Sequence, residues 1–179
     1  IDVGVRKRQE DVHAVEAPAV HFGGGGHVEH GFKIDHGFRV RTAFADNCAP
    51  CHGAGGGGAK GYPNLNDDEW LWGGNLEQIM QTIQYGVRSG HPKTHESAML
   101  AFGKEGVLKK DQIVTVANYV RSLSGMSTSP GYDASAGAKI FADNCASCHG
   151  DQGKGNQELG APDLTDKIWL YGSDEATLV

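Results

Sequence analysis

Four cysteines fall into two short motifs, and a histidine closes each of them. The motifs contain, in order, Cys48, Cys51 and His52, and Cys145, Cys148 and His149. The pattern C-x-x-C-H is the attachment signature of c-type haem, in which the two thiols add to the haem vinyl groups and the histidine becomes an axial ligand of the iron. One turn of helix would place both sulfur atoms and the imidazole on one side. The sequence therefore predicts two covalently bound haems c.

Other uses of paired cysteines fit this sequence less well. A zinc site needs four protein ligands that converge in one place, and a thioredoxin-like redox site needs one C-x-x-C motif within a βαβ pattern. A disulfide framework is the third alternative. Here two motifs each carry the histidine, and no cysteine is left over. The haem interpretation is favoured, and it places the protein outside the cytoplasm, where haem c is attached.

The two motifs lie in two copies of one module. Residues 44–48 (Phe-Ala-Asp-Asn-Cys) recur unchanged at 141–145, an offset of 97. Further along the chain, Pro63 corresponds to Pro162, and the run Trp-Leu-Trp-Gly that begins at Trp70 corresponds to the run Trp-Leu-Tyr-Gly that begins at Trp169, at an offset of 99. A repeat of this length indicates duplicated small domains rather than a solenoid.

Spacing and turn residues divide the chain into four parts. Residues 1–38 form an irregular segment rich in His and Gly, and 39–125 form a first cytochrome-like domain. Residues 126–132 contain Ser, Thr, Pro and Gly and predict a short linker. Residues 133–179 repeat the opening of the first domain and form a second, incomplete one.

Three helices are expected in the first domain. One leads into the cysteine motif, with Phe44 one turn before Cys48. Apolar residues at positions 76, 79, 80 and 83 recur at helical spacing and predict the second helix. Those at 113, 116, 117 and 120 predict the last one, which Ser124 and Gly125 end. The predicted fold class is all-α, and the second domain stops before the equivalent of this last helix.

Composition and charge exclude several classes of protein. Hydrophobic residues make up 39% of the 179 residues, so two small domains have little apolar side chain for their cores, and haem is expected to fill them. The net charge of −6 argues against a nucleic-acid partner. No apolar run approaches the ~18–20 residues of a membrane helix. The charge is uneven: residues 41–125 hold 8 basic and 8 acidic side chains, and 126–179 hold 3 and 8.

The second axial ligand of a c-type haem iron is usually Met or His. Met99 lies in an irregular loop between His52 and the last helix, and we expect it to be this ligand for the first haem. The alternatives are His91 and His95 on the same loop. Met80 lies on the apolar face of a helix, where core packing is its expected role. The repeat offset carries the distal position of the second haem beyond the last residue of the sequence.

The front of the chain has no clear periodicity. Residues 1–38 hold five of the nine histidines, at positions 13, 21, 27, 30 and 36. The segment is either flexible and loosely docked or a metal-binding tract. The scattered positions show no repeated ligand spacing, which favours the first interpretation.

Three longer stretches resemble one known family. They read GYPNLNDDEWLWGG at 61–74, VANYVRSLSG at 116–125 and GAPDLTDKIWLYGS at 160–173. With the cysteine motifs, they make residues 41–179 similar to the dihaem subunit, called CcoP or FixP, of cbb3-type cytochrome c oxidases. The resemblance implies two class I cytochrome c domains in tandem, of which the second is truncated here.

The resemblance also implies a function. The family passes electrons from a donor cytochrome c toward the subunit that reduces oxygen to water, in a respiratory complex that pumps protons. The expected role is electron transfer rather than catalysis, and the expected partners are the donor and the catalytic and monohaem subunits. In the family a transmembrane helix before the first domain anchors the protein on the periplasmic side of the bacterial inner membrane. This sequence contains no such helix.

Roles for individual residues follow from the same resemblance. The haem-attaching thiols are those of Cys48, Cys51, Cys145 and Cys148, the proximal ligands are His52 and His149, and the distal ligand of the first haem is Met99. The carbonyls of Pro63 and Pro162 are expected to accept the Nδ1 hydrogen of the axial histidines. Trp70 and Trp169 are expected to be buried, with the indole N–H donating to a haem propionate or the ring simply packing in the core.

The sequence departs from the family in three places, one of which is residues 1–38, where nothing matches the family. Met99 is followed by Leu100, where the family usually has Pro. The second opening helix has Gly137 four residues before Phe141, as is usual, but the first has Val40 at that position. A wider crossing with the last helix is therefore expected in the first domain.

Three functional alternatives remain beside the oxidase subunit. One is a free-standing periplasmic dihaem electron carrier, and another is the cytochrome subunit of a membrane dehydrogenase or nitric oxide reductase. A third, a dihaem peroxidase, needs an open distal position and a nearby catalytic acid. The tandem WLWGG and WLYGS segments favour the oxidase subunit.

Overall fold

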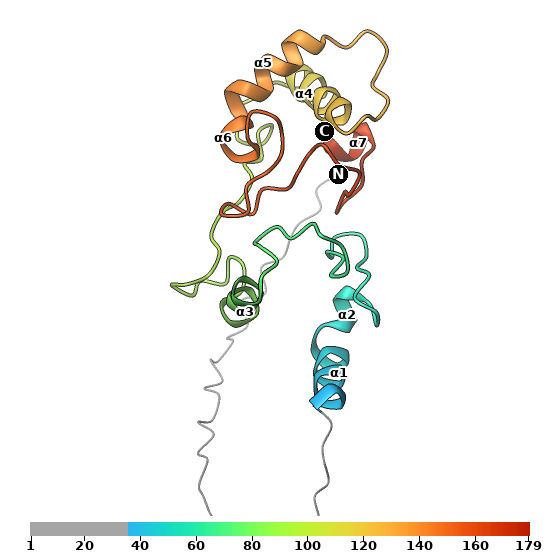
Figure 1. The fold of residues 1–179 in the computed structure, drawn as a ribbon. Helices are drawn as coiled ribbons and strands as arrows, with labels where there is room; N and C mark the ends of the chain where they lie inside the picture. Colours follow the sequence, from blue (N-terminus) through green and yellow to red (C-terminus); the bar gives the residue numbers. More distant parts are fainter. Residues whose placement is uncertain (1–35) are drawn as a thin grey trace, which may run out of the picture. The chain divides into compact units, whose positions relative to one another are not determined.

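The computed structural model describes residues 36–179, and this part of the chain is helical without strands (Figure 1). The helices are α1 (His36–Asn47), α2 (Ala49–His52), α3 (Leu76–Tyr85), α4 (Lys110–Leu123), α5 (Ala134–Asn144), α6 (Ala146–His149) and α7 (Glu175–Leu178). The predicted all-α class is confirmed. Most of the segment expected to be irregular lies outside the described residues, and α1 begins at His36, inside the range assigned to that segment.

The two repeats begin in the same way. In each, a long helix (α1 or α5) runs into a one-turn helix (α2 or α6) that contains the second cysteine and the histidine. The Cys48 N–H donates to the Phe44 carbonyl at 2.8 Å, and the Cys145 N–H donates to the Phe141 carbonyl at 2.8 Å. The placement of each aromatic one turn before the motif therefore reflects a continuous helical hydrogen-bond pattern.

Polar side chains fix where the longer helices start. Asn75 and Gln78 form a capping box at the start of α3, each side chain bonding the backbone N–H of the other. Asp133 accepts from the Ala136 N–H at the start of α5. Such caps satisfy N–H groups that have no partner within the helix. The spacing of apolar residues predicted α3 and α4 correctly.

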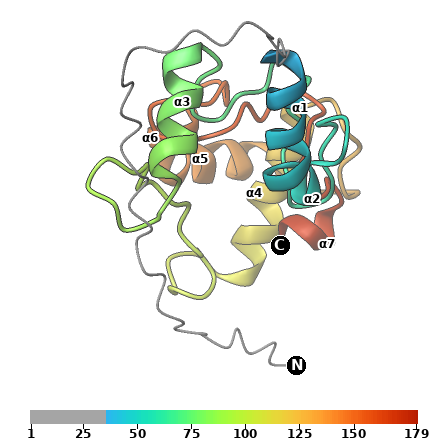
Figure 2. The same ribbon diagram turned by 90° about the horizontal axis from the view of Figure 1, so that it is seen from below.

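The main buried core forms where α4 packs against α5 (Figures 1 and 2). Leu108, Val116 and Phe141 are its buried members. The Tyr119 and Phe141 rings lie 5.5 Å apart, centroid to centroid, in a tilted arrangement. Gly137 allows the close crossing, because a Cβ at this position would lie 2.7 Å from the Tyr119 Cβ.

This pairing differs from the one expected from the sequence. The last helix of the first repeat, α4, was expected to pack within that repeat, but its helical partners are α5 and α7 of the second. Within residues 36–179, α1 contacts no helix other than α2. The two opening helices differ at the crossing position, where α5 has the buried Gly137 and α1 has Val40, which is 68% exposed. The glycine therefore gives α5 the closer approach.

A buried asparagine joins α4 to the linker and to α7. The Asn118 side chain is fully buried. Its amide donates to the Val114 carbonyl at 3.0 Å and to Glu175 Oε2 at 2.7 Å, and its oxygen accepts from the Ser129 N–H at 2.7 Å. The Ser129 hydroxyl also donates to Glu175. These bonds satisfy the amide and lower the pKa of Glu175, chiefly through Ser129 and then Asn118.

Across residues 36–179, every helix is too short or too polar to cross a lipid bilayer.

Candidate haem sites

The two cysteine motifs adopt nearly the same geometry. The first cysteine of each, Cys48 or Cys145, caps a one-turn helix with φ of −110° or −115°. The second, Cys51 or Cys148, lies on that turn and is exposed, and all four thiols are free. Burial raises the pKa of the Cys145 thiol, and the neighbouring Cys148 adds to the effect. Each motif thus presents two unpaired thiols three residues apart on one helical turn.

Each histidine is held by a proline carbonyl from the following loop. His52 Nδ1 lies 2.8 Å from the Pro63 oxygen, and His149 Nδ1 lies 3.0 Å from the Pro162 oxygen. A carbonyl can only accept, so Nδ1 carries a hydrogen in both rings, and in the neutral form of each ring the lone pair lies on Nε2. A bond of this kind fixes the orientation and basicity of a metal-ligating imidazole. The predicted Pro63 and Pro162 contacts are present.

The loops that bring the prolines back are also repeated. The Gly58 N–H donates to the His52 carbonyl at 2.8 Å, and the Gly155 N–H donates to the His149 carbonyl at the same distance. A Cβ at Gly155 would lie 2.5 Å from the Ala161 carbonyl oxygen, so only glycine allows the loop to close this tightly. These glycine-rich loops therefore hold the proline carbonyls at the histidines.

The tryptophans of the two repeats are half-buried rather than fully buried. The Trp169 indole nitrogen is inaccessible and has no hydrogen-bond partner. A buried donor without an acceptor is uncommon in proteins, and an anionic propionate of a haem at this repeat would supply one. The observation favours the propionate interpretation of Trp169 over plain core packing.

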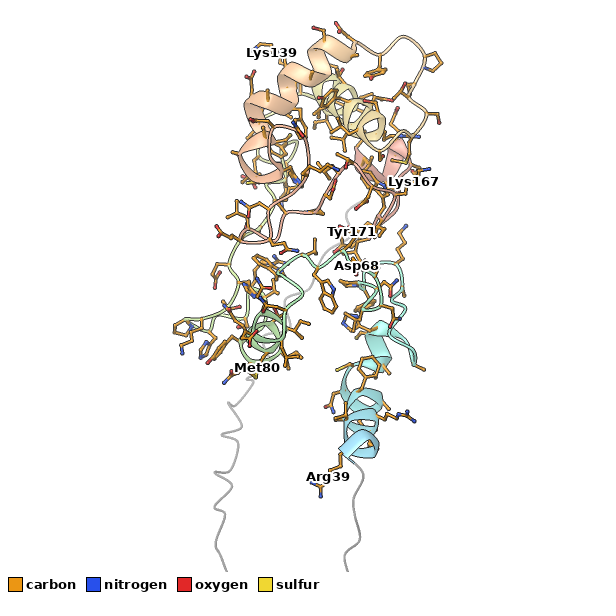
Figure 3. The ribbon with its side chains drawn as sticks, viewed as in Figure 1. Arg39, Asp68, Met80, Lys139, Lys167 and Tyr171 are labelled. Carbon is orange, nitrogen blue, oxygen red and sulfur yellow. The ribbon has the colours of Figure 1, made fainter. Side chains whose placement is uncertain are left out.

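Helix α3 presents an apolar face outward. Leu76 and Ile83 are each 78% exposed, and Met80, which Figure 3 shows on this helix, is 60% exposed. The expectation that Met80 packs in the core is wrong, because α3 makes no helix–helix contact within the described part of the chain. An apolar face that no other helix covers within the described residues suits the apolar edge of a porphyrin. The residues present therefore fit a haem.

The three candidates for the distal ligand differ in their contacts. Met99 is 75% exposed. His95 stacks on Trp72 with ring centroids 4.2 Å apart, and its Nε2 lies 3.1 Å from the Thr82 hydroxyl. His91 stacks on the Tyr85 ring at 4.6 Å. His91 is exposed and His95 is half-buried. The stacking of His95 on Trp72 was not predicted from the sequence.

Acidic side chains of the two repeats meet near the second proline loop. Burial alone would raise the pKa of Asp163, but hydrogen bonds from Thr165 and Lys154 hold it below its usual range. Burial, followed by the charge of Asp166 and a hydrogen bond with it, raises the pKa of Glu69. Glu69 belongs to the first repeat and both aspartates to the second, so this surface carries an acidic contact between repeats.

The described residues contain no other cluster suited to a metal. Among residues 36–179, no three His, Cys, Asp or Glu side chains come together as a set of ligands. A zinc site built from the two cysteine motifs is therefore not formed in this part of the chain. Four of the five N-terminal histidines for which a metal-binding role was considered, at positions 13, 21, 27 and 30, lie outside the described residues.

Two C-x-x-C-H turns with proline-held histidines, on a frame that is helical and without strands over residues 36–179, define a c-type cytochrome. The family model for cytochrome c matches residues 39–124 and 134–178, and the chain belongs to this family. The two cysteine pairs bind two haems c covalently.

Comparison with curated relatives shows which cytochromes c the chain resembles. The chain is 76% identical over 139 residues to the cbb3-type cytochrome c oxidase subunit FixP of Bradyrhizobium diazoefficiens, covering 78% of this chain and 48% of that protein. It is 65% identical over 139 residues to FixP of Azorhizobium caulinodans, with 78% and 47% covered. It is 49% identical over 138 residues to CcoP of Cereibacter sphaeroides, with 76% and 47% covered. The resemblance drawn from the sequence is confirmed, and the chain spans about half the length of these relatives.

Proposed function

We propose that this chain forms the electron-transferring part of a cbb3-type cytochrome c oxidase. It takes single electrons from a donor cytochrome c and passes them toward the oxygen-reducing subunit, and it has no catalytic residue of its own. Its partners are the donor and the catalytic and monohaem subunits, on the periplasmic side of the bacterial inner membrane. The observation that carries the proposal is the pair of repeat-equivalent bonds from His52 to Pro63 and from His149 to Pro162.

The side chains of the motifs have separate tasks in this function. A haem bound at each motif supplies a one-electron iron couple. Two cysteines would attach the haem at each motif, and His52 or His149 would ligate its iron through Nε2 while the proline carbonyl holds the ring in place. Trp169 donates its otherwise unpartnered N–H to a propionate. Trp70 occupies the equivalent position in the first repeat and has the same role at the first haem.

Met99 is the distal ligand of the first haem in this proposal. The loop before it is tied to the first repeat, since His95 stacks on Trp72 and the Arg88 N–H donates to the His95 carbonyl at 2.7 Å. The Arg88 side chain donates to the Ser97 carbonyl at 2.8 Å, which anchors the chain two residues before Met99. The thioether is exposed and free of the ring contacts that hold His91 and His95.

Electrons enter at the second haem. Residues 126–179 hold 8 acidic and 3 basic side chains, whereas residues 41–125 are balanced at 8 and 8. An acidic surface attracts a basic donor and raises the rate of encounter. The second repeat is therefore the docking surface, and the first repeat passes the electron onward.

The first experiment combines an intact mass with optical spectra of the oxidised and reduced protein. The expected mass exceeds that of the polypeptide by two haems, and a reduced basic cytochrome c is expected to reduce both irons. A mass without haem would contradict the covalent sites. A protein that carries two haems but reacts directly with peroxide instead of accepting electrons would support the peroxidase alternative.

A further inference from the structure

The two repeats touch through residues that correspond to each other. Gly61 corresponds to Gly160, and Trp72 corresponds to Tyr171, both at the repeat offset of 99. A Cβ at Gly160 would lie 2.2 Å from Cζ2 of the Trp72 indole, and a Cβ at Gly61 would lie 3.6 Å from Cε1 of Tyr171. The aromatic residue of each repeat thus lies against the equivalent glycine of the other.

A backbone hydrogen bond joins the same two loops. The Gly61 N–H donates to the Leu170 carbonyl at 2.8 Å, next to Tyr171. In a two-fold interface between identical units, residue i of the first unit contacts residue j of the second, and residue j of the first contacts residue i of the second. Here the two units are repeats of one chain. We call the set Gly61, Trp72, Gly160 and 170–171 the inter-repeat seam.

The seam lies beside both axial histidines. Gly61 precedes Pro63 by two residues, and Gly160 precedes Pro162 by two residues, so both glycines belong to the loops whose carbonyls hold His52 and His149. A pocket next to the seam is lined by residues of both repeats, among them Trp70 and Pro162.

Trp72 is fixed from both sides. One face of its indole stacks on His95, with an interplanar angle of 17°. Thr82 holds the imidazole through its hydroxyl at 3.1 Å from Nε2. The benzo edge of the indole lies against Gly160, where any side chain would occupy the same space. Because the indole is held by His95 of its own repeat and lies against Gly160 of the other, it restricts how the two repeats can move relative to each other.

We propose that the inter-repeat seam fixes the two haem modules in one relative orientation, with Trp72 as the positioning residue for electron exchange between the haems. The exchange part rests on the function proposed above. It moves one electron from a ferrous to a ferric haem iron, with no bond made or broken and no proton transferred. The seam ties each histidine-holding loop to the aromatic segment of the other repeat, which fixes the separation that the electron has to cross.

Gly160→Ala in the haem-loaded chain tests the seam. The new methyl group would displace the Trp72 ring and open the contact. The φ of Gly160 is +60°, so alanine also adds backbone strain. Gly106→Ala is the matched control, because Gly106 has φ of +69° but nothing within 4 Å of a Cβ. Hydrogen exchange of the Gly61 amide, on the far side of the seam, should accelerate roughly tenfold or more in Gly160→Ala and stay unchanged in Gly106→Ala.

Substitutions of Trp72 provide the second arm. Trp72→Tyr, which copies the second repeat, should retain Gly61 protection and the rate of electron exchange between the haems, whereas Trp72→Ala should lower both. In a Trp72→Ala background, adding Gly160→Ala should accelerate exchange of the Gly61 amide no more than adding Gly106→Ala does.

Fast exchange of the wild-type Gly61 amide would overturn the seam. Normal Gly61 protection and unchanged haem-to-haem exchange in Gly160→Ala would also overturn it. Loss of donor oxidation with Gly61 still protected would count against the proposed function alone.

Discussion

At the scale of single residues, the proposed distal ligand of the first haem shares one loop with two histidines. His91 and His95 are both held by aromatic rings, and Met99 is exposed. Met99→His should therefore exchange a thioether for an imidazole at the iron. Because Met raises the potential of a haem relative to a second His, the potential of one haem should fall by roughly 0.1 V or more, within the ~0.8 V range that axial ligands span. A redox titration followed optically measures the change.

Met80→His is the control for that titration. Met80 is also exposed, but it lies on α3 rather than on the loop. The same chemical change there should leave both potentials and the spectrum of the oxidised protein unchanged. A shift at Met80→His with none at Met99→His would assign the ligand to α3 and refute Met99.

Glu69 gives a pH dependence of known sign. Its pKa is raised in the folded protein, first by burial and then by the charge of Asp166. A raised pKa means that the folded state holds the proton more tightly than the unfolded state does. Stability from this group is therefore full below its ordinary pKa of 4.5 and is lost as pH rises through the folded pKa. Since the side chain is exposed, the effect is expected to be small.

Glu69→Gln should remove this dependence and make the protein slightly more stable at neutral pH. Denaturant unfolding at several pH values, compared between the variant and the parent, measures it. Asp68→Asn, at the neighbouring exposed position, is the control for a general change in charge. A stability difference between Glu69→Gln and the parent that does not vary with pH would refute the contact with Asp166.

Much of each site could be predicted at this scale because it is local in sequence. The cysteines and histidines follow from the motif, and Pro63 and Pro162 follow from the family resemblance. The stacking of His95 on Trp72 could not be predicted, because the two residues lie 23 positions apart and no periodicity connects them. The contact of Trp72 with Gly160 spans the two repeats, so the repeat alignment identified equivalent positions but not which of them touch.

At the scale of helices, α4 shows where sequence patterns stop being sufficient. Its apolar positions predicted a helix with one buried face, and Val116 and Ala117 are buried as expected. The pattern does not say which helix covers that face, because α1 and α5 carry the same Phe-Ala-Asp-Asn ending. The boundary at 126–132 between two domains stays a prediction, since α4 lies before it and packs on α5 after it.

Gly137→Ala tests the crossing of α4 and α5. In an isolated helix this change stabilises by about 1 kcal/mol. Here the added Cβ would lie 2.7 Å from the Tyr119 Cβ and 3.2 Å from the Thr115 carbonyl oxygen, so the helices must separate. We expect a net loss of about 1–3 kcal/mol in the free energy of unfolding, as for other overpacked cores.

The control for this test is Ser135→Ala, at an exposed position of the same helix. It should leave the free energy of unfolding unchanged or raise it slightly, in line with helix propensity. Denaturant unfolding measures both variants. If Gly137→Ala stabilises the protein as much as propensity alone predicts, α4 and α5 do not cross at this residue.

At the scale of the whole molecule, the two repeats have similar geometry at their haem-attachment motifs but differ in charge. The cysteine turns and proline loops agree closely between them, but residues 126–179 hold 8 acidic and 3 basic side chains, whereas residues 41–125 hold 8 of each. In the proposed function, this difference in charge sets the direction of electron transfer: a basic donor docks at the second repeat, and the first repeat faces the acceptor.

The ionic-strength dependence of donor oxidation tests this direction. The exposed side chains of Asp151 and Glu158 lie on the loop after His149. Asp151→Asn combined with Glu158→Gln should slow reduction by a basic cytochrome c by roughly two- to fivefold at low salt, because part of the steering field is lost. The difference should vanish near 1 M salt, where the Debye length is only ~3 Å. Glu96→Gln combined with Glu105→Gln removes the same charge from the first repeat and should leave the rate unchanged. Equal slowing by both pairs would mean that the donor responds to net charge alone and would refute entry at the second haem.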